Sequence, residues 1–171
     1  MMATYYHPDA KPSWQGQNTQ VVTVGPNDQA RWINISLEVT AAQVEAVNTV
    51  FRFIRLGEDT VVLDGNFVTD VIDAHASTPT LVLDVGLSDG GTSDDPDYFV
   101  NGVVNTATEG INTPFATTAG MNTALGQRFQ AVADYYVEAL VQTAAATGAA
   151  GTITVSLLLG NKSTVAPAPI L

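Results

Sequence analysis

The segment RWINISLEVT, which spans Arg31 to Thr40, decides the fold class of this chain. Its large aliphatic residues stand at every second position, and polar residues stand between them: the aliphatic set is Ile33, Ile35, Leu37 and Val39. Successive side chains of a strand point to opposite faces. The period of two therefore predicts a strand with one face in the core and the other in water.

Similar patterns recur along the chain. From Leu81 to Ser88 the aliphatic residues at 81, 83, 85 and 87 are set against Asp84 and Ser88, which we expect to face water. The segment Thr152 to Leu159 ends in the apolar run VSLLLG, which indicates a strand covered on both sides. Further strands are predicted at Gln20 to Val24, Thr49 to Leu56 and Thr60 to Val71. Strands at this spacing, with turn signals between them, predict an all-β sandwich or barrel.

Two segments allow more than one interpretation. Ala41 to Val47 fits either one or two helical turns, or a loop with an early strand start. Phe129 to Thr143 fits an amphipathic helix or a strand with Tyr135, Val137, Ala139 and Val141 inward. We favour the strand, because the adjacent Tyr-Tyr-Val suits a pleated surface. The loop AAATGAAG and the segment TITVSLLL that follow then predict a long hairpin.

Composition bounds the class of protein. The chain has 171 residues, 46% hydrophobic and only 13% charged, which fits one folded domain whose exterior is largely uncharged. Such a surface is desolvated at low cost and favours oligomerisation. The net charge is -11, and the six Lys and Arg residues form no stripe, which argues against nucleic-acid binding. The chain has no cysteine and no apolar run that suggests a membrane partner.

Pro-bearing ends predict a body with two extended arms. Residues 1-18 contain Pro8 and Pro12 and form the predicted N-terminal arm, and residues 164-171, with the sequence TVAPAPIL, form the predicted C-terminal tail. Residues 19-163 are the predicted sandwich domain. Large aromatic and aliphatic residues in a Pro-bearing arm are hard to bury in their own domain, so we expect them to contact a partner. These residues are Tyr5, Tyr6, Trp14, Pro167, Ile170 and Leu171.

The residues that carry chemistry form no recognised catalytic set. His7 lies in the arm and His75 in DAHASTP, and neither has a second ligand at metal spacing, so surface or turn histidines are expected. No nucleophile elbow and no phosphate-binding loop occurs. The acidic stretch from Asp84 to Gly102 offers carboxylates that could bind calcium, namely Asp89, Asp94, Asp95 and Asp97. Asp, Gly and Ser also simply form turns, and a solvated loop is the favoured interpretation.

Aromatic residues suggest a second class of function. Trp14, Trp32, Tyr98 and the Tyr135-Tyr136 pair could form a platform for a sugar. Trp32 opens the alternating strand, however, and is expected in the core or at its rim. We therefore expect that the chain is not an enzyme and binds no cofactor, and we keep a carbohydrate-binding module as an alternative function.

Three segments carry a resemblance to a known group: RFIRLGEDTVVLDGNFVTD (52-70), TLVLDVGLSDGGTSDDPDYFVNG (80-102) and YYVEALVQTAAATGAAGTITVSLLLG (135-160). In this order they resemble small virion structural proteins of tailed bacteriophages, of the kind encoded near the major capsid protein. The resemblance implies a two-layer antiparallel β-sandwich, jelly-roll-like, and no catalytic residues.

The resemblance also implies a role. It implies a capsid cement or decoration protein on the capsid exterior, made in the host cytoplasm, which bridges major capsid subunits and is often a homotrimer. The alternatives are a head-to-tail or tail component, expected in rings of six or twelve, and a carbohydrate-binding adhesion or fibre module.

Overall fold

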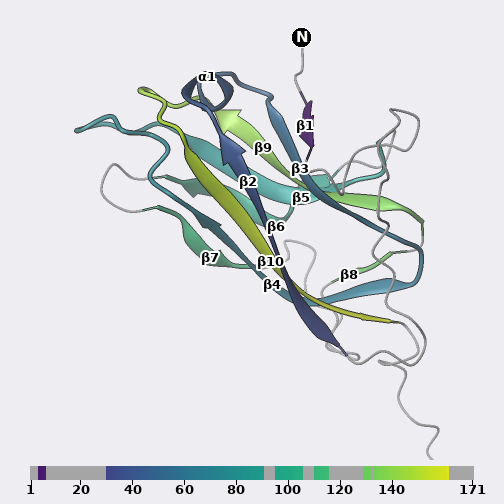
Figure 1. The fold of residues 1–171 in the computed structure, drawn as a ribbon. Coiled ribbons are helices and arrows are strands. Elements are labelled where there is room, and N and C mark those ends of the chain that lie inside the picture. Colours follow the sequence, from purple (N-terminus) through teal and green to yellow (C-terminus); the bar gives the residue numbers. More distant parts are fainter. Residues whose placement is uncertain are drawn as a thin grey trace, which may run out of the picture.

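The computed structural model describes residues 4–6, 30–90, 95–105, 110–115, 129–131 and 133–161. Its one helix is the single turn α1 (Ala41–Val44), and every other element is a strand (Figure 1). The strands are β1 (Thr4–Tyr6), β2 (Arg31–Val39), β3 (Val50–Leu56), β4 (Thr60–Thr69), β5 (Val82–Ser88), β6 (Asp95–Val104), β7 (Asn112–Pro114), β8 (Phe129–Gln130), β9 (Tyr135–Thr143) and β10 (Gly151–Asn161). In this part of the chain no helix has the length and hydrophobicity needed to cross a bilayer.

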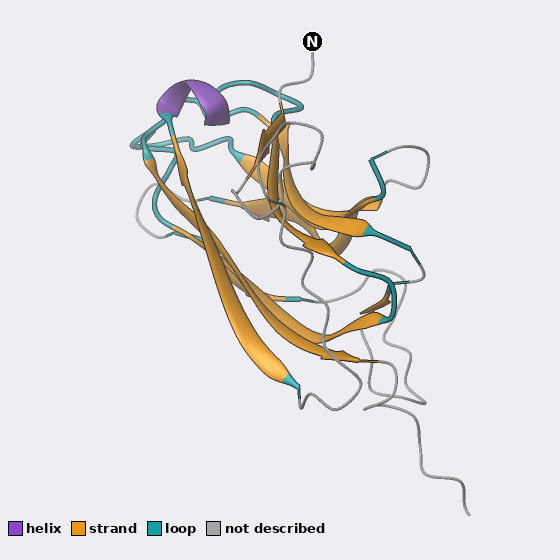
Figure 2. Ribbon diagram, turned by 45° about the vertical axis from the view of Figure 1, so that its right-hand side comes forward, coloured by secondary structure: helices purple, strands orange, loops and turns teal. Residues whose placement is uncertain are grey.

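The strands form two facing sheets. One sheet has the order β2-β10-β4-β7, with β8 also paired to β4, and the other has the order β1-β3-β9-β5-β6. All pairings are antiparallel except that of β1 with β3. If β1 and β8 are left out and the other eight strands are renumbered 1 to 8 along the chain, the two sheets have the strand orders 1-8-3-6 and 2-7-4-5. This is the strand order of a jelly roll. Figure 2 shows the two layers, with α1 at one end. The predicted jelly-roll-like sandwich is confirmed.

The core lies between the two layers, where the period-two residues meet. In β2, Ile35 and Val39 are buried, and in β10 the aliphatic residues at 153, 155, 157 and 159 are buried. Five phenylalanines are fully buried: Phe51, Phe53, Phe67, Phe99 and Phe115. Phe53 of one sheet meets Phe67 of the other edge to face, with ring centroids 6.5 Å apart. The space between the sheets is therefore packed with side chains, as in a protein interior.

Both ambiguous segments are settled by the structure. Ala41–Val44 forms one helical turn, in which the Thr40 backbone N–H donates to Gln43 Oε1 at 2.7 Å. Of the strand predicted over Phe129 to Thr143, Tyr135–Thr143 forms β9, with Val137, Ala139 and Val141 buried and Tyr135 half-buried, whereas Phe129–Gln130 forms β8 in the other sheet. The predicted hairpin is wrong, because β9 pairs with β3 and β5 whereas β10 pairs with β2 and β4 in the other sheet. The loop between them crosses from one layer to the other.

Four further expectations need correction. Asp84 and Ser88 are buried, because β5 is an inner strand and its outer face is also covered. The predicted acidic loop is shorter than expected, since β6 begins at Asp95. Trp32 is 55% exposed, because its position in β2 places it on the outward face. In β10 the alternate residues, such as Leu158, are half-buried, so its second face is only partly covered.

Candidate interaction surfaces

Asp73 fastens the loops at one end of the sandwich. Its carboxylate is buried and accepts five backbone N–H groups, from His75, Thr80, Leu81, Ala146 and Thr147, at 2.7 to 3.2 Å. Burial alone would raise the pKa of Asp73, but the hydrogen bonds from these backbone groups outweigh it and the pKa is lowered. The carboxylate stays charged and joins the loop after β4 to the loop between β9 and β10.

Asn105 completes this end. Its Oδ1 accepts the backbone N–H groups of Ile72 and Asp73, both at 3.1 Å. Its Nδ2 donates to Thr69 Oγ1 and to the Asp70 carbonyl, both at 2.9 Å. The Asn105 amide thus binds three backbone groups and the Thr69 hydroxyl, so we assign the cluster to stability. His75, the described histidine, lies in the adjoining turn, where its Nδ1 accepts the Thr78 N–H at 3.0 Å.

An ion pair lies on the outer face of the sheet that contains β3, β5 and β9. Arg52 Nε is 2.9 Å from Glu138 Oε2, and Arg52 Nη2 donates to Ser88 Oγ at 3.3 Å. The guanidinium also lies 4.6 Å from the centre of the Tyr136 ring. Glu138 and Ser88 are buried. Because the carboxylate is neutralised by Arg52, this cluster is suited to joining three strands and not to taking a proton from Ser88.

The acidic stretch forms part of β6 and its junction with β5. Burial raises the pKa of Asp84 and of Asp95, and the nearby charge of Asp97 raises both further. Asp84 Oδ1 accepts the Gly102 N–H at 2.7 Å, and Asp97 Oδ2 accepts Asn101 Nδ2 at 2.6 Å. Within the described ranges no three His, Asp or Glu side chains are placed to hold a metal ion. Of the predicted calcium ligands, Asp89, Asp95 and Asp97 are described, and Asp94 lies outside the described residues.

Of the aromatic residues proposed for a sugar platform, Tyr98 and Tyr135 both pack against Phe129, whereas Trp32 lies on the other sheet and Trp14 lies outside the described residues. Tyr98 is half-buried, and its ring packs edge to face against Phe99 at 5.1 Å and against Phe129 at 5.5 Å. Burial raises the pKa of its hydroxyl, and the charge of Asp95 raises it further. Trp32 lies on the outward face of the other sheet. Sequence reasoning missed the packing of Tyr98, because the neighbouring Phe129 is distant in sequence.

Of the predicted partner-contacting residues, Tyr5 and Tyr6 fall within the described residues. The backbone of Tyr5 and Tyr6 belongs to β1, which pairs with β3 opposite Phe51 and Arg52 (Figure 1). Trp14, Pro167, Ile170 and Leu171 lie outside the described residues, as does the predicted strand at 20–24. Their roles remain predictions.

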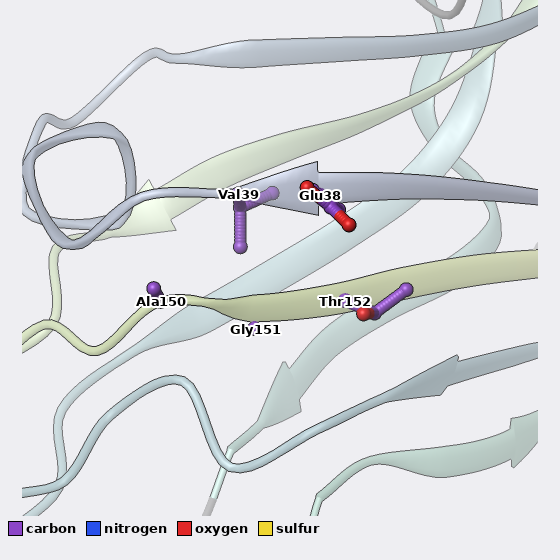
Figure 3. Close-up of a pocket in the computed structure, with 5 residues that line it drawn as sticks. All are labelled: Glu38, Val39, Ala150, Gly151 and Thr152. Atoms are coloured by element: carbon purple, nitrogen blue, oxygen red, sulfur yellow. The ribbon is translucent and has the colours of Figure 1, made fainter.

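A shallow hollow lies at the paired ends of β2 and β10. It is lined by Glu38 and Val39 of β2, by Ala150 just before β10, and by Gly151 and Thr152 at the start of β10 (Figure 3). Glu38 is its one ionisable residue. This set contains no pair of nucleophile and base, so the hollow is a feature of surface shape and not a candidate active site.

The outward face of β2, β10 and β4 carries few charges, because its ionisable residues among those described are Glu38 of β2 and Asp64 of β4. The Ser36 and Thr154 hydroxyl oxygens are 2.8 Å apart, and Asn66 Nδ2 donates to Asn112 Oδ1 at 3.0 Å. Asn34 and Ser36 are exposed. The prediction of a charge-poor exterior holds for this face, which could be covered by a partner with little loss of ionic hydration.

Comparison with known proteins identifies the fold. No protein-family model and no curated protein matches the chain. A chain of the "Capsid of Ralstonia phage GP4" structure matches with a TM-score of 0.65 and 21% identity, covering 93% of this chain and 98% of that chain. A chain of the "Cyanophage Pam1 capsid asymmetric unit" matches with a TM-score of 0.57 and 20% identity, covering 84% and 95%. The resemblance to virion structural proteins of bacteriophages is confirmed at the level of the fold.

Proposed function

We propose that this chain is a non-enzymatic structural protein of a bacteriophage virion. The observation that carries the proposal is the fold shared with a chain of a phage capsid over nearly the whole length of both chains. The space between the sheets also supports it, because the described core consists of packed aliphatic and aromatic side chains, which suits a structural role. Jelly rolls of this kind are used repeatedly in viral capsids.

The specific role that we propose is a cement or decoration protein on the capsid exterior. In this role the chain bridges major capsid subunits, as a homotrimer, and the charge-poor outward face of β2, β10 and β4 supplies area that is desolvated at low cost. The terminal arms add contact area for few residues. The aromatic residues Tyr5, Tyr6 and Trp14 and the tail residues Pro167, Ile170 and Leu171 are the proposed contacts.

Binding to shells tests this role. The purified chain is first sized by light scattering and then mixed with capsids that lack it, and bound protein is measured by co-sedimentation. We expect a trimer that saturates the shells and raises the temperature at which they release their contents. Trp14→Ala should weaken binding, whereas Val47→Ala, which trims an exposed apolar residue in a loop of the body, should not.

The outcomes separate the alternatives. A stable monomer without affinity for shells would overturn the proposed role. Rings of six or twelve would favour a head-to-tail or tail component. Specific binding to a glycan array, lost in Trp14→Ala or in a Trp32→Ala variant, would favour an adhesion module.

A further inference from the structure

The four sheet edges of the described structure differ in how well they are protected. Strands β1 and β7 have three residues each, and β7 ends at Pro114. Strand β6 is long, but it contains Pro96 and its pairing with β5 is interrupted by register shifts. Short length, proline and bulges are the devices by which proteins block edge-to-edge pairing. Three of the four edges therefore carry such a device.

Strand β2 carries none of these devices. It has nine residues without proline, and all nine pair with β10 without a register shift. On its other side no strand pairs with it in the described part of the chain. The outward N–H and C=O groups of this edge form a straight template for another strand.

The side chains of β2 also favour an added strand. Ile33 and Leu37 point toward the core but are only half-buried, because they lie at the open margin between the two sheets. Trp32 is 55% exposed on the other face. A strand placed alongside would cover the exposed parts of these apolar residues on both faces.

The edge is complementary to itself. Arg31 lies at one end of β2 and Glu38 near the other, and both are exposed. When two copies pair in antiparallel fashion about Ile35, Arg31 lies opposite Val39 of the partner and Glu38 lies opposite Trp32, so no like charges face each other across the edge. If Ile35 lies on the two-fold axis, all nine residues overlap and Ile33 faces Leu37 of the partner. A slip by one residue would place polar residues against the core margin, so it is disfavoured.

From these observations we propose that β2 is a homotypic interface, through which two copies of this chain join their β2-β10-β4-β7 sheets into one continuous sheet. This interface is independent of the proposed virion role. It is isologous, so it produces dimers, or joins trimers in pairs.

A disulfide trap tests the register. The chain has no cysteine, so the double variant Asn34→Cys/Ser36→Cys introduces the only thiols. In the proposed register position 34 faces position 36 of the partner, whereas neither position faces itself. Two residues apart on one strand, the thiols are too distant for an internal bridge. We expect a covalent dimer after mild oxidation of the double variant and much less from either single variant. Equal yields from all three would overturn the register.

Charge variants test the interface itself. In the proposed register, positions 34 and 36 of the two copies face each other in two places. Asn34→Lys/Ser36→Lys puts two like charges together at both places, whereas Asn34→Lys/Ser36→Glu puts a positive and a negative charge together at both. Both variants lose the Ser36 hydroxyl near Thr154, so they are matched. In sedimentation velocity over a dilution series, we expect the dissociation constant to rise about tenfold in the first and to stay equal or fall in the second.

Two outcomes would overturn the proposal. One is association of the Lys/Lys variant as tight as that of the original chain, with the same urea unfolding midpoint. The other is loss of shell binding in that variant without any change in self-association, which would assign the edge to a strand of a shell subunit. Retained shell binding with impaired pairing leaves the virion role untouched, so the two proposals fail separately.

Discussion

Asp73 shows how one residue can hold a loop region together. Replacement by Asn puts an N–H₂ group where one of the acceptor oxygens meets backbone N–H groups. We expect Asp73→Asn to lower the free energy of unfolding by about 3 kcal/mol at pH 7, since buried donors lose a charged acceptor. Urea unfolding measures this change, with the exposed Glu58→Gln as a control of equal charge change.

The same variant makes a prediction about pH. The pKa of Asp73 is lowered in the folded state, so its charge stabilises the fold above the ordinary carboxyl pKa. This contribution is lost as the pH falls through the folded-state pKa. The difference between Asp73→Asn and the original chain should therefore shrink below about pH 4. A constant difference from pH 7 to pH 2.5 would contradict this account.

Arg52 and Glu138 provide a second prediction at this scale. Removal of one partner leaves the other charge buried, so Arg52→Met should destabilise the fold by about 3 kcal/mol. The double variant Arg52→Met/Glu138→Leu should be clearly more stable than the sum of the single changes implies. A double-mutant cycle in urea measures the coupling, and purely additive effects would show that the ion pair contributes nothing.

At the scale of elements, Gly86 in β5 is constrained by the bulged strand β6. A Cβ atom at Gly86 would lie 2.0 Å from the Asp95 carbonyl oxygen and 2.4 Å from the Pro96 carbonyl carbon. Gly86→Ala must therefore displace β6, at an expected cost of about 3 kcal/mol in unfolding free energy. Gly102→Ala is the comparison: its Cβ would make only an ordinary contact with the Val82 side chain, and the positive φ of 66° costs about 1 kcal/mol. Equal midpoints in thermal unfolding would contradict the close packing.

The strands that sequence predicts best are those whose burial follows a simple rule. In β2 the alternation of Ile35 and Val39 with polar residues reflects one dry and one wet face, and the prediction is confirmed. In β5 the rule fails, because Asp84 and Ser88 are buried beneath groups from distant parts of the chain. Local periodicity contains no information about such cover.

The interaction surfaces were less predictable than the fold. Strand β6 begins in a segment of Asp and Pro that is typical of turns, and its pairing with β5 depends on that partner strand. The ion pair of Arg52 and Glu138 joins residues 86 positions apart, and the open edge of β2 exists only once the strand order is known. These features belong to topology, which a single sequence does not specify locally.

For the whole molecule, protection against hydrogen exchange should follow the strand order. Strands β9 and β10 each have a paired strand on both sides and lie against the core. The amides in the middle of these two strands should therefore exchange slowest, through global unfolding. Amides in β7, a three-residue edge strand, should exchange fastest among the strands of the sandwich. Mass spectrometry of labelled peptides measures this ranking, and rapid exchange in β10 would contradict the assigned topology.

The pairing of Arg31 with Leu159 also has a mechanical consequence. Arg31 and Leu159 lie side by side at one corner of the sandwich, on the antiparallel neighbours β2 and β10. A pull applied to both of these points would act in the unzipping geometry, in which the hydrogen bonds between β2 and β10 break one after another. In the shear geometry they would all bear the load together. If the molecule has to resist tension, the force should therefore pass through the surfaces of the sandwich, or through only one of these two points.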